Sequence, residues 1–166
     1  MKLSQNFTLE EFTNAGHGKL IGKDEQFQLS DEFITNAKNL CVHLVQPIRD
    51  YINVRYGTGV GLKDIPLHVI SGYRSKFVND HVHGSKTSYH LRAMAMDPKC
   101  LVNGRLHNDY ILEAVNVMQL PFTELIREFG TEKNPLIMHV ALDVNHVTHT
   151  RKRGLKRNGK TVYFKD

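Results

Sequence analysis

The chain has 166 residues, of which 40% are hydrophobic and 23% charged, a composition typical of one globular domain. This composition excludes disordered and fibrous classes. No apolar stretch approaches the roughly 20 residues of a membrane-spanning helix. The first six residues lack the apolar core of a signal peptide. We therefore expect a protein that is made in a cytoplasm and does not span a membrane.

The formal net charge of +5 is concentrated at the C-terminus. Residues 151–166 contain seven Lys or Arg residues and one acid, whereas the first 150 residues contain 15 bases and 16 acids. Such a segment attracts polyanions, including nucleic acid, anionic lipid and acidic polymers. The alternative is a solvated hairpin that only aids solubility. We divide the chain into a body, 1–150, and a basic C-terminal tail, 151–166, which is part of the same domain or an appended hairpin.

The first half of the chain is predicted to be helical. Residues 8–11 have the form of a capping box, which predicts a short helix. A polar loop is expected over 16–22. Apolar residues at helical spacing over 33–45 predict a buried helix face, and Pro47 is expected to kink or split this helix before it stops at Gly57.

Strands are predicted mainly in the second half. Pro98 is expected to stop one of them, and an amphipathic helix is predicted over 108–118. The predicted strands cover 66–71, 93–97, 122–129 and 136–142. Helices early and strands late favour an α+β domain, in which helices cover one face of a small, mainly antiparallel sheet.

Three residues with side chains that can bind a metal lie on predicted strands or on a turn beside one. His90 and Asp97 lie on a turn and on the strand that follows it, and His139 lies inside an apolar strand. Imidazole and carboxylate are ordinary zinc ligands, and a catalytic zinc has three protein ligands and an open position. Spacing alone leaves a buried core histidine as the alternative for His139. Cys100 follows Asp97 closely, but the ligand set is complete without it.

Several motifs, in the correct order over residues 6–142, closely resemble the zinc D-alanyl-D-alanine carboxypeptidase and L-alanyl-D-glutamate endopeptidase family. The family signature S-x-H-x-x-G-x-A-x-D is similar to Ser88–Asp97, and its S-G-Y-R-S segment is found at Ser71–Ser75. Its short, phage- or prophage-borne branch has N-F-T-L-x-E-F and L-x-Q-P-I-R-D segments, which resemble Asn6–Phe12 and Leu44–Asp50. The resemblance implies a Hedgehog/D-Ala-D-Ala-peptidase-like fold.

The resemblance also implies roles for individual residues. The implied zinc ligands are His90, Asp97 and His139. Arg74 is implied to polarise the scissile carbonyl and to stabilise the oxyanion, which requires a fixed cation. The side chains predicted to contact substrate are Ser88, Tyr73 and, at the rim of the cleft, His83.

The residue that carries the proton is less directly implied. Some family members place an acid three positions before the last ligand, where this chain has Leu136. The short branch has an L-I-x-E strand, which matches Leu125–Glu128. We therefore prefer Glu128 over Glu124, on the condition that its strand pairs with the His139 strand. The alternative for Glu128 is a carboxylate at a sheet edge.

Some residues depart from the family pattern. Ala93 replaces the usual glycine, which is expected to be tolerated if φ is negative there. Tyr89 replaces a common glutamine, and a second histidine found just before the last ligand in the carboxypeptidase branch is absent. The ligand set is unaffected by these changes, but the preference for one bond does not carry over.

We predict from this a zinc metallopeptidase that cuts an amide of peptidoglycan stem peptides, of the D-Ala-D-Ala carboxypeptidase or L-Ala-D-Glu endopeptidase type, in phage or prophage lysis. It is expected to reach the cell wall from the host cytoplasm after release, and the basic tail is expected to contact anionic wall polymers. One alternative is a non-catalytic, zinc-containing wall-binding module. The other is nucleic-acid binding through 151–165, which the absence of a basic face on the body disfavours.

Overall fold

The computed structural model describes residues 1–14, 24–57 and 64–166. The predicted loop over 16–22 lies outside these residues. The described helices of the N-terminal third are α1 (Leu9–Asn14), the 3-10 turn η1 (Asp24–Gln26), and a continuous run of α2 (Asp31–Leu40), η2 (Cys41–Val45), α3 (Gln46–Ile52) and η3 (Asn53–Gly57). None of the described helices is long and apolar enough to cross a membrane.

The capping box predicted for α1 is confirmed. The backbone N–H of Thr8 donates to Glu11 Oε2 at 3.0 Å, and the N–H of Glu11 donates to Thr8 Oγ1 at 3.2 Å. These reciprocal bonds satisfy N–H groups that a helix N-terminus otherwise leaves without partners. The helix lies against β1 (Leu67–Ser71), which leads into the candidate site.

The long helical run passes through Pro47 without splitting. A regular α-helix would bring the proline ring against the carbonyl four residues earlier. Here η2 is a π-helical segment in which the N–H of Gln46 donates to Cys41 O, five residues back. The wider turn places Pro47 at the start of α3, so the helical run accommodates the proline through a π-helical segment. The run is helical up to Gly57, and the residues that follow this predicted stop lie outside the described part of the chain.

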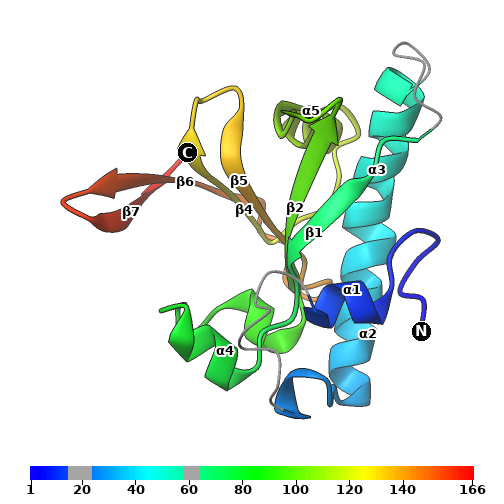
Figure 1. Cartoon of the computed structure of the whole chain (residues 1–166), viewed down its shortest axis with the longest axis vertical. Coiled ribbons are helices and arrows are strands. Elements are labelled where there is room, and N and C mark those ends of the chain that lie inside the picture. Colours follow the sequence, from blue (N-terminus) through cyan, green and yellow to red (C-terminus); the bar gives the residue numbers. More distant parts are fainter. Residues whose placement is uncertain (15–23, 58–63) are drawn as a thin grey trace.

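One face of this helical run forms much of the hydrophobic core. Its side chains at helical spacing are fully or almost fully buried: Leu40, Leu44, Ile48 and Ile52. They join a core cluster that also includes residues of the sheet and of α5 (Asp109–Val117). Figure 1 shows the run lying along one side of the sheet. Because one face of the run packs against the core, its apolar residues recur at helical spacing in the sequence.

The predicted α+β architecture is confirmed. The remaining elements are α4 (Lys76–His81), η4 (Tyr89–Arg92), β2 (Ala95–Val102), β3 (Arg105–Leu106), β4 (Glu124–Gly130), β5 (Pro135–Ala141), β6 (Thr150–Arg157) and β7 (Lys160–Lys165). The strands of this set and β1 form a seven-stranded sheet of order β1-β2-β5-β4-β6-β7, with β3 paired to β2. Every pair is antiparallel except β4–β6, which is parallel.

Pro98 does not stop the second predicted strand, and that prediction was wrong. β2 continues to Val102, with Pro98 opposite Val69 beside a register shift in β1. The pairs of β2 with β5 are Ala95↔Ala141 and Met96↔Val140, so that ladder has ended before Pro98. A proline is tolerated in a strand at a bulge or where no ladder partner is needed, and both conditions hold at this position.

The basic segment folds as a C-terminal hairpin, formed by β6 and β7. Its first strand pairs with β4 from Glu124↔Thr150 to Glu128↔Gly154. The hairpin therefore extends the sheet of the body (Figure 1) and faces the same two acids that the sequence proposed as proton carriers.

Candidate metal centre

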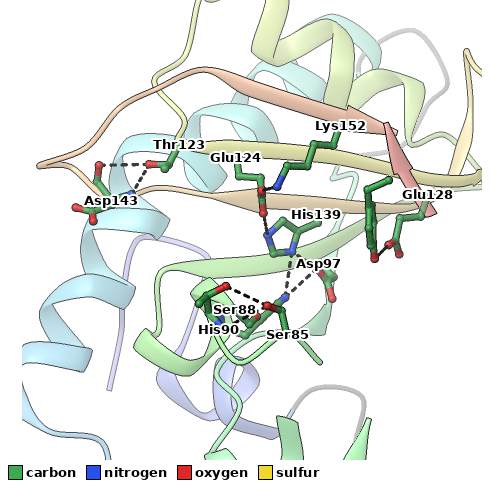
Figure 2. Close-up of polar contacts among 12 residues, drawn as sticks. Ser85, Ser88, His90, Asp97, Thr123, Glu124, Glu128, His139, Asp143 and Lys152 are labelled. Carbon is green, nitrogen blue, oxygen red and sulfur yellow. Dashed lines mark hydrogen bonds and ion pairs between the residues drawn. The ribbon is translucent and has the colours of Figure 1, made fainter. Parts of the chain in front are cut away.

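Three side chains from separate elements meet on the sheet. They are His90 from η4, Asp97 from β2 and His139 from β5, and their ligand atoms all lie within 4.8 Å of one another. Asp97 Oδ1 lies 3.2 Å from His90 Nε2 and 2.9 Å from His139 Nδ1, and these two nitrogens are 3.1 Å apart. None of the three residues is more than 9% exposed. Figure 2 shows the three side chains pointing toward one another.

Hydrogen bonds of its backbone and of its ring hold His90 in place. Ser88 caps η4, and its Oγ accepts a hydrogen bond from the His90 N–H at 3.3 Å. The ring Nδ1 lies 2.6 Å from the carbonyl oxygen of Gly72, to which it donates, so the lone pair of Nε2 is directed into the cluster. Burial is the main cause of the lowered pKa of His90, and the ring is therefore neutral near pH 7.

Gly72 is required by the close approach of α1. A Cβ at this position would lie 2.2 Å from Phe12 O and 2.7 Å from a ring carbon of Phe12. The N–H of Tyr73 donates to the same carbonyl of Phe12 at 3.0 Å. The two motifs Asn6–Phe12 and Ser71–Ser75 therefore form one structural unit, which presents the Gly72 carbonyl to His90.

Ala93 has a positive φ of 56°, which corrects the expectation of a negative one. It lies in the left-handed region immediately after η4 and turns the chain toward β2. A residue without Cβ adopts this conformation at lower cost, and this accounts physically for the glycine of the family signature. The alanine methyl is fully buried, so its burial offsets part of that cost.

The two oxygens of Asp97 have different partners. Oδ1 faces the histidines, whereas Oδ2 accepts a hydrogen bond from Arg74 Nη2 at 2.9 Å. Arg74 Nε in turn donates to Ser71 Oγ at 2.9 Å. Burial raises the pKa of Asp97, but the neighbouring His90 and His139 outweigh that effect and hold this pKa far below its usual range. Asp97 is therefore ionised, as a metal ligand must be.

Glu124 faces the outer nitrogen of His139, a contact that the sequence did not indicate. Glu124 Oε1 lies 3.6 Å from His139 Nε2, a buried atom with no hydrogen bond among the described residues. Lys152 of β6 donates to the other carboxylate oxygen of Glu124. Figure 2 shows Glu124 between Lys152 and His139. With a metal on Nδ1, the proton of His139 is on Nε2 and Glu124 is positioned to accept it.

Replacing Glu124 with alanine is expected to weaken zinc binding by about 10-fold to 100-fold, the loss typical of an outer-shell partner. Glu124→Gln keeps an acceptor for the His139 proton and should lose less. Competition with a chromophoric chelator measures both affinities. An alanine variant that binds zinc as tightly as the wild type would rule out this role for Glu124.

Glu128 lies on the same face of the sheet as His139. In the β4–β5 ladder Ile126 is opposite His139 and Glu128 is opposite Ile137. Because side chains two residues apart share a face, Glu128 and Glu124 flank Ile126 on the His139 side. The predicted pairing of the two strands is confirmed. Leu136, three residues before His139, belongs to the opposite face by the same alternation and is 56% exposed.

Two of the three residues predicted to contact substrate have other partners in the described structure. Ser88 caps η4, and Tyr73 is 8% exposed with its ring 5.9 Å from that of Phe33. His83 is exposed after α4 with a φ of 55°. Substrate contact by these three residues remains a prediction. Cys100 is buried in β2 outside the cluster, and burial raises the pKa of its thiol to about 12.

The fold and this cluster define a candidate mononuclear metal centre of the two-histidine, one-carboxylate type on an α+β domain. The donor set fits zinc, because two imidazole nitrogens and one ionised carboxylate converge in a buried position.

Comparison with known families agrees with this class. The sequence model of the family Peptidase M15 matches residues 32–129, more than half of the chain. The chain therefore belongs to the Peptidase M15 family of zinc-dependent metallopeptidases, which includes the D-Ala-D-Ala carboxypeptidases. The matched segment contains His90, Asp97 and Glu128 and ends before His139. No curated protein matched the chain.

Proposed function

We propose that this protein is a zinc peptidase that hydrolyses an amide bond in peptidoglycan stem peptides. The observation that carries the proposal is the buried convergence of His90, Asp97 and His139 in a member of the Peptidase M15 family. The substrate class follows from the resemblance of Ser71–Ser75 and Ser88–Asp97 to peptidases of the bacterial cell wall.

The proposed zinc ligands are His90 Nε2, an oxygen of Asp97 and His139 Nδ1. A bound zinc ion supplies Lewis-acid catalysis, which polarises a carbonyl and makes water acidic enough to lose a proton near neutral pH. Glu128 takes the proton from the attacking water and delivers it to the nitrogen of the leaving amine. Arg74, which donates to Asp97 Oδ2 through Nη2, stabilises in this proposal the negative charge that develops on the amide oxygen.

The proposed setting is phage or prophage lysis, with synthesis in a host cytoplasm and access to the wall after release. Its support is the likeness of Asn6–Phe12 and Leu44–Asp50 to the short, phage-borne branch. Bases of the C-terminal hairpin are proposed to contact anionic wall polymers. Lys152 and Arg151 already have partners in Glu124 and Asn116, so that contact would involve the other bases.

A synthetic stem pentapeptide tests the proposed activity. We expect the zinc-loaded protein to cut one of its amides and to produce a new amine terminus, detected by mass spectrometry. A peptide that binds, as measured by calorimetry, but stays intact would instead support the non-catalytic wall-binding module. A peptide that neither binds nor is cut would overturn both.

A further inference from the structure

The C-terminal hairpin lies outside the segment matched by the family, yet it contacts both acids of β4. Lys152 donates to Glu124, and the hydroxyl of Tyr163 donates to Glu128 Oε1. From composition the hairpin resembled a solvated basic tail. Its contacts with two acids on the His139 face indicate a more specific role.

The contact between Tyr163 and Glu128 spans three strands. Glu128 of β4 is opposite Gly154 of β6, and Gly154 is opposite Tyr163 of β7. The tyrosine therefore reaches Glu128 across the middle strand, over the position of Gly154. A Cβ at Gly154 would lie 3.0 Å from Tyr163 Cε1, 3.1 Å from Glu128 Cγ and 3.3 Å from Glu128 Oε1. The absence of a side chain at Gly154 leaves the space in which the two residues meet.

We propose that the C-terminal hairpin is part of the active site and that Tyr163 is a positioning residue for Glu128. This inference rests on the proposed function, because it takes Glu128 as the proton carrier. A glutamate on a strand has several rotamers of similar energy, and a fixed donor at Oε1 restricts it to those that leave Oε2 available for water. Preorganisation of this kind increases turnover without adding a contact to the substrate.

Tyr163 is suited to act as the donor at neutral pH. Burial, followed by the hydrogen bond to Glu128 and by the negative charges of Glu128, Asp97 and Glu124, raises the pKa of Tyr163. The hydroxyl therefore keeps its proton. Its partner Glu128 lies on β4, on the face of the sheet that carries His139.

Tyr163→Phe removes the hydroxyl and leaves the ring. We expect kcat to fall about tenfold, because a hydrogen bond to a charged group is lost, while KM and bound zinc stay within about twofold of the wild type. Gly154→Ala should also lower kcat, since its methyl group would displace the two side chains. Unchanged kcat in Tyr163→Phe would overturn the proposal.

A matched control is available in another part of the fold. Tyr56 of η3 donates its hydroxyl to Glu113 of α5, so Tyr56→Phe removes the same kind of bond away from the candidate centre. Its kcat should equal that of the wild type. An equal loss of kcat in Tyr56→Phe and Tyr163→Phe would show a general loss of structure and would contradict a positioning role.

The glutamine variant of Glu128 separates this inference from the proposed function. If Glu128→Gln keeps full turnover, the assignment of the proton carrier fails, and the inference fails with it. If Glu128→Gln is inactive and Tyr163→Phe is fully active, only the inference fails. Support requires that Tyr163→Phe causes no further loss in the Glu128→Gln background, which is the non-additivity of two residues that act as a unit.

A readout independent of activity tests the contact itself. Because Glu128 raises the pKa of Tyr163, Glu128→Gln should make this tyrosine titrate at lower pH. The Cζ resonance of labelled tyrosine, assigned with Tyr163→Phe, follows that titration by NMR. An unchanged titration in Glu128→Gln would overturn the contact on which the proposal depends.

Discussion

Glu128→Gln is expected to lower the turnover of amide hydrolysis by about 100-fold to 10,000-fold, the contribution typical of a general base. Glutamine has almost the same shape but cannot take a proton from water or deliver it to the leaving amine. Zinc binding should be unchanged, because Glu128 is outside the set of three ligand residues. Turnover is measured on a stem peptide, and zinc content by atomic absorption.

The exposed Glu132, in the turn between β4 and β5, provides a matched control. Glu132→Gln makes the same chemical change near the same strands and should keep wild-type turnover. Full activity in Glu128→Gln would remove Glu128 from the mechanism and favour Glu124, the other acid on this face.

His139→Ala is expected to weaken zinc binding by more than about 100-fold, since a direct ligand should matter more than an outer-shell partner. Loss of zinc should also lower stability. Zinc at about 1,000 times its Kd stabilises a folded protein by about 4 kcal/mol if the unfolded chain does not bind it. We therefore expect zinc to raise the melting temperature of the wild type and to have little effect on His139→Ala.

The exposed His43, on the helical run, provides the control for this experiment. His43→Ala should bind zinc and respond to it as the wild type does. The alternative interpretation of His139 as a core histidine makes a different prediction. It implies that zinc affinity is unchanged in His139→Ala and that only the stability of the metal-free protein falls.

Much of the candidate site was predictable because its elements are specified locally. Ser88 caps the turn that carries His90, and His90 and Asp97 are separated by only seven residues. The pairing of β4 with β5 follows from two apolar stretches joined by a short turn. These signals are contained in short segments, so the family motif and the physical pattern agree.

The contacts of the C-terminal hairpin were not predictable from the same kind of signal. β6 pairs with β4 in parallel, although β5 lies between these two strands along the chain. No local turn therefore specifies the register of this pair. The many Lys and Arg residues of β6 are typical of a solvated segment, although Lys152 is bound to Glu124. Gly154 had no predicted role, although a glycine inside a strand is a residue type that marks close approach of its neighbours.

Two local predictions failed or changed for reasons that lie in the backbone. Pro98 is accommodated beside a register shift, and such a shift depends on the partner strand as well as on the proline. Ala93 adopts the left-handed conformation although alanine disfavours it, because η4 must turn into β2 at that point. In both cases the surrounding tertiary structure outweighs the intrinsic preference of one residue.

We propose that a zinc centre formed by His90, Asp97 and His139 hydrolyses an amide of peptidoglycan. Its most direct test is mass spectrometry of purified cell wall after digestion with the zinc-loaded protein, beside a sample treated with chelator. We predict stem-peptide fragments with one new amine terminus in the zinc-loaded sample, and none in the chelated sample until zinc is restored. Identical fragments in both samples, or no new amine terminus in either, would contradict the claim.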